Sequence, residues 1–122
     1  NINIRNSGSN RKGKIMSLAE KILAAWDKTM ETGDTEHLSE FLSDDFVFIN
    51  NVDEESNRPE VLDWSANGGL RISNFQTIYE DENVFCAKHS VTQQNTGPSN
   101  VMVFAKHENG KVTFWKVHRA FE

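Results

Sequence analysis

His89 is the side chain in this sequence whose type and setting best suit proton chemistry. It stands in the alternating stretch of residues 84–93, on a face that it shares with apolar side chains. Imidazole titrates near neutrality, so it can accept and return a proton beside a substrate. A core histidine that only hydrogen-bonds to a neighbour fits the same pattern. We take His89 as the candidate catalytic residue and keep the structural interpretation open.

Arg119 and Asn50 are the polar residues expected to position a ligand near this histidine. Arg119 lies near the end of the last strand-like stretch and can hold a carboxylate or enolate. It can instead form an ion pair with Asp27 or Asp63, and both interpretations remain open. Asn50 ends the alternation of residues 46–50, where its amide can orient a substrate carbonyl.

Metal and cofactor chemistry find little support in the sequence. His89 is expected on one sheet face and His107 and His118 on the other, whereas zinc ligands must converge. Cys86 is the single cysteine, which excludes an internal disulfide and a thiolate cluster. The three acids at 53–55 fit a solvated loop better than a cation site. We predict neither a metal nor a cofactor.

Helical signals fill the first half of the chain and strand signals the second. A capping box at residues 17–20 begins a helix that Gly33 ends, a short helix follows over 35–42, and a third begins at 57–60. Alternation and turn residues predict strands over residues 46–50, 71–80, 84–93, 100–107 and 111–121. This order predicts an α+β domain that ends in an antiparallel meander.

The hairpin turns predict which strand residues face the helices. A two-residue turn at 109–110 places Phe104 opposite Trp115, and the preceding turns extend that face to His89 and Tyr79. The ligand-binding residues expected there, together with the helix residues that face it, are Asn50, Arg119, Tyr79, Trp26, Trp64, Met102, Phe104 and Trp115.

The opposite face is expected to be apolar and to lack a cover. Its predicted members are Ile78, Val84, Val101, Val103, Ala105, Val112 and Phe114, beside Cys86, Lys88, Lys116 and His118. No further element remains in the chain to pack against it, and an apolar strip of this size normally finds a partner. We therefore expect a homodimer through this outer face.

Charge and length limit the classes of function. A chain of 122 residues with three Trp and eight Phe suffices for one core. From Met16 onward it carries 9 basic against 18 acidic residues, and such a body repels phosphate, so we expect no nucleic-acid partner. It has neither a membrane-spanning apolar run nor a signal peptide, which predicts a cytoplasmic protein without membrane contact.

Residues 1–15 differ from the rest in composition. They are rich in Asn, Ser, Gly, Lys and Arg and show no periodicity. One interpretation is that Met16 is the natural initiator and that residues 11–13 derive from a ribosome-binding site. The other is a disordered basic arm. In both cases residues 16–122 are expected to form a single domain.

The order and spacing of these elements resemble the nuclear transport factor 2-like (NTF2-like) superfamily, which includes the SnoaL-like polyketide cyclases and the ketosteroid isomerases. The most specific part is Gly33-Asp34 followed by Asp44-Asp45 and a short strand, and the resemblance covers residues 17–121. It implies a cone-shaped curved antiparallel sheet, wrapped by three N-terminal helices around an internal pocket and usually found in a dimer.

The resemblance also implies where isomerase chemistry would lie. The isomerases use an Asp base with an oxyanion hole made by a Tyr and a protonated Asp. By position these residues fall on Asn50, Trp26 and Met102. An amide cannot take a proton near neutral pH, and neither an indole nor a thioether replaces the two donors. We exclude that isomerase mechanism for this chain.

Two hypotheses about function follow. The first is a SnoaL-like enzyme of the lyase, isomerase or cyclase type, which acts on a small, largely apolar molecule by proton transfer at His89. The second is a non-catalytic dimeric module for ligand binding or protein interaction. The missing carboxylates favour the second hypothesis, and the inward His89 and Arg119 favour the first.

Overall fold

The structure, a computed structural model, describes residues 16–93 and 96–121 and has its elements in the predicted order. The helices are α1 (Leu18–Thr32), α2 (Glu36–Ser39) and α3 (Arg58–Ala66). The strands are β1 (Leu42–Ile49), β2 (Glu55–Asn57), β3 (Leu70–Glu80), β4 (Val84–Gln93), β5 (Thr96–Glu108) and β6 (Lys111–Phe121). Of these, β2 is absent from the sequence prediction. The leader expected over residues 1–15 lies outside the described residues.

Helix α1 begins where the sequence predicts because its first turn is capped twice. Ser17 Oγ accepts from the N–H of Glu20, and the Glu20 carboxylate accepts from the N–H of Ser17. The Glu80 carboxylate, which comes from β3, accepts from the N–H groups of Leu18 and Ala19 at 3.0 and 2.9 Å. These four N–H groups are those that a helix leaves without intrahelical partners. The caps therefore fix the start of α1 to the sheet.

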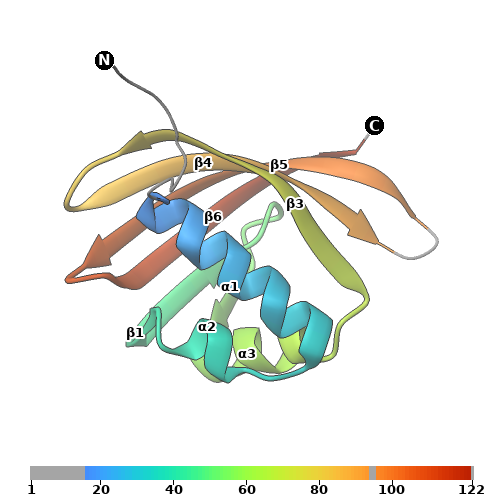
Figure 1. Cartoon of the computed structure of the whole chain (residues 1–122), viewed down its shortest axis with the longest axis horizontal. Coiled ribbons are helices and arrows are strands. Elements are labelled where there is room, and N and C mark those ends of the chain that lie inside the picture. The colour runs from blue at the N-terminus through green and yellow to red at the C-terminus, as the bar shows by residue number, and fades with distance from the viewer. Residues whose placement is uncertain (1–15, 94–95, 122) are drawn as a thin grey trace, which may run out of the picture.

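The six strands form one curled sheet in the order β2-β1-β6-β5-β4-β3. Neighbouring strands are antiparallel except β1 and β6, which run parallel. The sheet is therefore mixed, whereas the sequence predicted a wholly antiparallel one. The sheet curves over the helices without closing, and α1 runs across its inner side (Figure 1). The predicted α+β cone is thus confirmed. Among the described residues, no helix covers the outer side.

The prediction of the β5 face is wrong. The two-residue turn into β6 is as expected, but a bulge beside it shifts the register, so that Ala105 and not Phe104 lies opposite Trp115. On the other side of β5, His89 pairs with Val101 and not with Phe104. Because side chains alternate along a strand, a one-residue slip turns the whole strand over. Met102 and Phe104 consequently point away from the helices.

A second bulge has the same effect on β3. It falls between Thr77 and Tyr79, so that Tyr79 pairs with Cys86 and turns to the outer side. The four valine and alanine residues expected outside are instead buried in the core; these are Val101, Val103, Ala105 and Val112. Six residues of β4 and β6 that were predicted to face inward are buried as expected: Phe85, Ala87, His89, Val91, Trp115 and Val117.

Candidate functional site

A small cavity lies between the helices and the inner side of the sheet. Its volume is about 100 Å³. Apolar side chains from α1, α3, β1 and the strands β3 to β6 form most of its wall, and His89 and Arg119 are the polar residues among them. An engineered apolar cavity of about 150 Å³ binds benzene. This cavity is smaller than that one, so it holds at most a single small ring or a short branched chain, and a four-ring steroid does not fit it.

Four aromatic rings in the cavity wall pack against one another in tilted and edge-to-face arrangements. The Trp26 ring lies 4.9 Å from that of Trp115 and 6.0 Å from that of Phe48, centroid to centroid, and Phe48 lies 5.5 Å from Trp64. The indole N–H of Trp26 donates to Ser65 Oγ at 2.8 Å within the core. Trp26 thus presents its ring to the cavity while its only donor is engaged elsewhere.

His89 stands in the cavity wall on β4 and is 7% exposed. Its Nδ1 lies 3.3 Å from the carbonyl oxygen of Ser90. Because a carbonyl can only accept, this contact assigns the proton of the neutral ring to Nδ1 and leaves a lone pair on Nε2. Burial lowers the pKa of His89, and the nearby charge of Arg119 lowers it further, against the opposing effect of the Ser90 carbonyl. The ring is therefore neutral at physiological pH.

Arg119 reaches the cavity from β6, and two of its contacts are with neutral side chains. Its Nε donates to Ser99 Oγ at 2.8 Å, and its Nη2 donates to Gln93 Oε1 at 3.0 Å. Burial lowers its pKa. The ion pair with Asp27, which the sequence left open, is contradicted because Asp27 binds Arg71 in a bidentate pair at 2.8 Å.

His89 and Arg119 lie in one row across three strands. Val101 of β5 pairs with His89 on one side and with Arg119 on the other. Since neighbouring strands lie about 4.8 Å apart, the two polar residues are separated by about 10 Å at their Cα atoms, with a small side chain between them. The row brings a base and a cation to the same part of the cavity.

Four of the nine predicted site residues lie away from this cavity. Tyr79, Met102 and Phe104 are on the outer side of the sheet, for the reasons of register given above. Asn50 closes the turn after β1, where its amide donates to Glu54 Oε1 and its oxygen accepts from two backbone N–H groups. The other five, Trp26, Trp64, His89, Trp115 and Arg119, line the cavity. Their role in binding stays a prediction.

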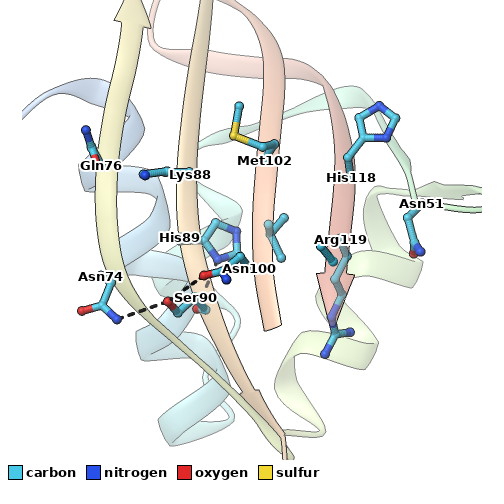
Figure 2. A pocket seen from close by; sticks show the side chains of 12 residues that line it. Asn51, Asn74, Gln76, Lys88, His89, Ser90, Asn100, Met102, His118 and Arg119 are labelled. Carbon is cyan, nitrogen blue, oxygen red and sulfur yellow. Dashed lines mark hydrogen bonds between the residues drawn. The ribbon is translucent and has the colours of Figure 1, made fainter. Parts of the chain in front are cut away.

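A second, wider hollow of about 770 Å³ lies on the outer side of the sheet. Lys88, Met102 and His118 line it from neighbouring strands, and Asn74 donates to Ser90 below them (Figure 2). Polar and apolar atoms share its wall about equally, its shape is open, and His89 and Arg119 border it as well as the inner cavity. Such a hollow fits a surface contact better than an enclosed substrate.

Metal-ligating groups do not converge within the described residues. No cluster of three or more His, Cys, Asp or Glu side chains occurs in residues 16–93 and 96–121. His107 is buried against Phe85, and its Nε2 lies 3.0 Å from the Asp81 carbonyl oxygen. Over the same ranges, no helix has the length and apolar character needed to span a membrane.

Ser65, Ser99 and Gln93 support the site and are absent from the sequence prediction. Ser65 could have been sought because a buried Trp needs an acceptor for its N–H. The partners of Arg119 depend on how β4 and β5 are joined, and local sequence does not define that register.

The fold is similar to that of several solved structures, although neither a family model nor a curated protein matches the sequence. An NTF2-like protein of unknown function from Cytophaga hutchinsonii has a TM-score of 0.70 at 11% identity, over 89% of this chain and 95% of the other. A protein from Kribbella flavida described as a candidate ketosteroid isomerase has a TM-score of 0.71 at 15% identity, over 86% and 78%.

An LEH-like epoxide hydrolase from M. tuberculosis is also similar, with a TM-score of 0.60 at 13% identity, over 84% of this chain and 83% of the other. Identities this low establish a common fold and not a common activity. The sequence resemblance to NTF2-like proteins is thus confirmed at the level of the fold.

Proposed function

We propose that this chain, which has the NTF2-like fold, binds a small and largely apolar molecule in its inner cavity and exchanges a proton with it through His89. One observation carries the proposal: an aromatic-lined cavity has in its wall a buried histidine that its surroundings keep neutral. The cavity volume favours a single ring or a short branched chain as the ligand.

The chemistry that best suits this arrangement is proton abstraction from a carbon next to a carbonyl. The Nε2 lone pair of His89 takes the proton, the electron pair of the C–H bond forms the C=C bond of an enolate, and the π pair of the carbonyl moves to its oxygen. The positive charge of Arg119 favours that developing anion. Return of the proton to another carbon gives an isomerisation, and loss of a leaving group gives a lyase reaction.

Ligand entry is tested by tryptophan fluorescence, because all three Trp residues of the chain line the cavity. Cyclohexanone is expected to change the emission in a saturable way. Val101→Leu fills the cavity and is expected to abolish that change, whereas Val84→Leu, on the outer side of β4, keeps it. An unsaturable response, or one that Val101→Leu leaves intact, would refute binding in the cavity.

Proton transfer is tested by deuterium exchange at the carbons next to the cyclohexanone carbonyl, followed by NMR in D₂O. The protein is expected to accelerate exchange, and His89→Gln to reduce the rate to that of the buffer. His37→Gln, at a partly buried position on α2 that does not line the cavity, is the control and is expected to leave the rate unchanged. Binding without accelerated exchange would leave a binding protein and remove the catalytic part of the proposal.

The second candidate function is a non-catalytic dimeric module, favoured by a separate observation. Four large apolar side chains, those of Ile78, Tyr79, Met102 and Phe104, are 37–55% exposed on the outer side of the sheet. Lys106 lies over the Phe114 ring on the same side, 5.4 Å from its centroid. Apolar side chains gathered in this way are typical of a protein interface. We propose that a second copy of the chain covers this face.

A further inference from the structure

We propose that the indole N–H of Trp115 donates a hydrogen bond to the oxygen atom of the ligand in the inner cavity, and that this bond selects neutral carbonyl compounds. The inference rests on the proposed function and names the residue that holds the oxygen of the ligand. It follows from a buried donor in the cavity wall, for which residues 16–93 and 96–121 supply no acceptor.

The three tryptophans of the cavity wall differ in how their N–H groups are satisfied. Trp26 donates to Ser65 Oγ at 2.8 Å. Trp64 is partly exposed, which allows its N–H to bind water. Trp115 is only 1% exposed, and in the part of the chain that the structure describes no group accepts a hydrogen bond from its Nε1. Within those residues, the Trp115 donor is therefore both buried and unpaired.

The rings that surround Trp115 do not replace an acceptor. Phe85 stands edge-to-face with it at 5.6 Å between centroids, and the Trp26 ring lies tilted at 4.9 Å. An aromatic ring is at best a weak acceptor. A buried donor without a partner is rare in folded proteins and indicates a place where water or a ligand binds. A ligand oxygen that replaces a water molecule there keeps the hydrogen bond.

Trp115 also has a suitable position relative to the base. It lines the cavity from β6, and His89 lines the same cavity from β4. The volume of about 100 Å³ is so small that one ring inside it contacts several sides of the wall. A ketone whose oxygen accepts from Trp115 can therefore present its neighbouring carbons to His89.

This hydrogen bond becomes stronger during the proposed reaction. As the C–H bond breaks, negative charge develops on the carbonyl oxygen, and a donor already directed at that oxygen stabilises the charge. The indole of Trp115 is a single neutral donor, so it does not restore the paired donors of the isomerases. It does give a cavity lined mainly by apolar side chains a way to distinguish a ketone from a hydrocarbon of the same shape.

The experiment compares cyclohexanone with methylenecyclohexane, which has a C=CH₂ group where the ketone has its carbonyl. NMR of the ¹⁵N-labelled protein follows the indole N–H signals of Trp26, Trp64 and Trp115, the three tryptophans of the chain. Both compounds are expected to bind. The Trp115 proton is expected to move further downfield with the ketone than with the hydrocarbon. The Trp26 proton, which is bonded to Ser65, is expected to respond equally to both.

Variants separate the hydrogen bond from the size of the ring. Trp115→Phe is expected to weaken binding of the ketone about 2- to 10-fold more than binding of the hydrocarbon, as for the loss of one neutral hydrogen bond. It should reduce deuterium exchange at saturating ketone by a larger factor, up to about 100-fold. Trp64→Phe shortens a ring in the same wall and is expected to change both affinities by the same factor. Far-UV circular dichroism checks that each variant folds.

The outcomes distinguish this inference from the proposed function, and the NMR comparison on the unmodified protein does not depend on either variant. If the ketone binds but both compounds move the Trp115 signal equally, the cavity still binds ligands and the inference is overturned. If the Trp64 signal responds to the ketone in place of the Trp115 signal, Trp64 is the donor and the inference is again overturned. If neither compound perturbs any indole signal, the proposed function fails and this inference fails with it.

Discussion

The indole N–H of Trp26 donates to the hydroxyl of Ser65 at 2.8 Å, and both residues are buried. The bond joins α1 to α3 behind the aromatic wall of the cavity. It also decides the role of Trp26, which stands where the resemblance to the isomerases places a Tyr donor. Because its single N–H is taken by Ser65, Trp26 contributes a ring surface and no hydrogen bond to a ligand.

Ser65→Ala is expected to destabilise the protein by about 1–3 kcal/mol, because it leaves the indole N–H buried without an acceptor. Chemical denaturation measures the free energy of unfolding. The double variant Trp26→Phe/Ser65→Ala should cost less than the sum of the two single changes, since Trp26→Phe removes the donor that Ser65→Ala alone leaves unpaired. Strict additivity would show that the bond contributes no stability.

The Asp27 carboxylate joins α1 to β3 and should make stability depend on acidity. It accepts from both Nε and Nη2 of Arg71 and from the N–H of Ile72, each at 2.8 Å. The hydrogen bond with Arg71 is the main cause that lowers the pKa of Asp27 in the folded protein, against the opposing effect of burial. The resulting stability is present above the unfolded pKa of about 3.9 and is lost as pH falls through the lower folded value.

Asp27→Asn is expected to lower the free energy of unfolding by roughly 1–2 kcal/mol at pH 7, a small effect because Arg71 is half exposed. The difference between wild type and variant should shrink below pH 4. Urea denaturation from pH 3 to pH 7 measures both quantities. Asp63→Asn, at an exposed position on α3, serves as the control. A difference that is constant with pH would contradict the assigned pair.

The Glu80 cap predicts a third stability effect. Its carboxylate accepts from the N–H groups of Leu18 and Ala19 at the start of α1, where the positive end of the helix dipole also favours a negative charge. Glu80→Ala is expected to cost about 1–2 kcal/mol, in the range of other lost N-terminal caps. Glu82→Ala, in the exposed turn that follows, is expected to be neutral. Equal stability of both variants would argue against the cap.

The two ends of α1 and the start of α3 could be predicted from sequence because their signals are local, whereas the short helix predicted over residues 35–42 ends at Ser39 and β1 begins at Leu42. The Ser17–Glu20 box is formed as predicted, and Gly33 adopts the left-handed φ of 78° that ends α1. Asn57 and Glu60 form a second capping box at the start of α3. In each case the residues that decide the structure are within four positions of one another.

The faces of the strands were harder to predict because a bulge adds a residue without a sequence signal. The turn between β5 and β6 was placed correctly, and Glu108 pairs with Lys111. The bulge just after it nevertheless placed Val101 in the cavity wall and Met102 outside. For the candidate site, residues on β4 and β6 were assigned correctly, whereas the β5 residues and Tyr79 were not.

Met102 was wrongly predicted to face the cavity, but this does not change the exclusion of the isomerase mechanism. The residue of β5 that faces the cavity is Val101, which has no more capacity to donate a proton than the thioether of Met102. Asn50 is likewise engaged in its own turn. Neither position supplies a carboxylic acid, so proton chemistry in this cavity depends on His89.

Because His89 is buried, the free energy of unfolding is expected to depend on pH near neutrality. Its folded pKa is lowered by burial and by Arg119, whereas the unfolded chain titrates near 6.5. As pH falls below 6.5, the unfolded chain binds the proton first, so stability decreases until the folded pKa is reached and then levels off. His89→Gln should remove this decrease between pH 7 and pH 5. Arg119→Met should raise the pKa of His89 measured by NMR, and an unchanged value would contradict the coupling.

The outer face provides the last prediction, which concerns the proposed homodimer. Exposed Met102 and Phe104 lie next to each other on one side of β5, and Phe104 contacts Phe114 at 6.4 Å between centroids. Light scattering at micromolar concentration should give twice the mass of the chain. Phe104→Lys should give the single mass, because it buries a charge in an apolar contact. Val52→Lys, in an exposed loop, should leave the dimer intact. A monomeric wild-type protein at this concentration would refute the interface.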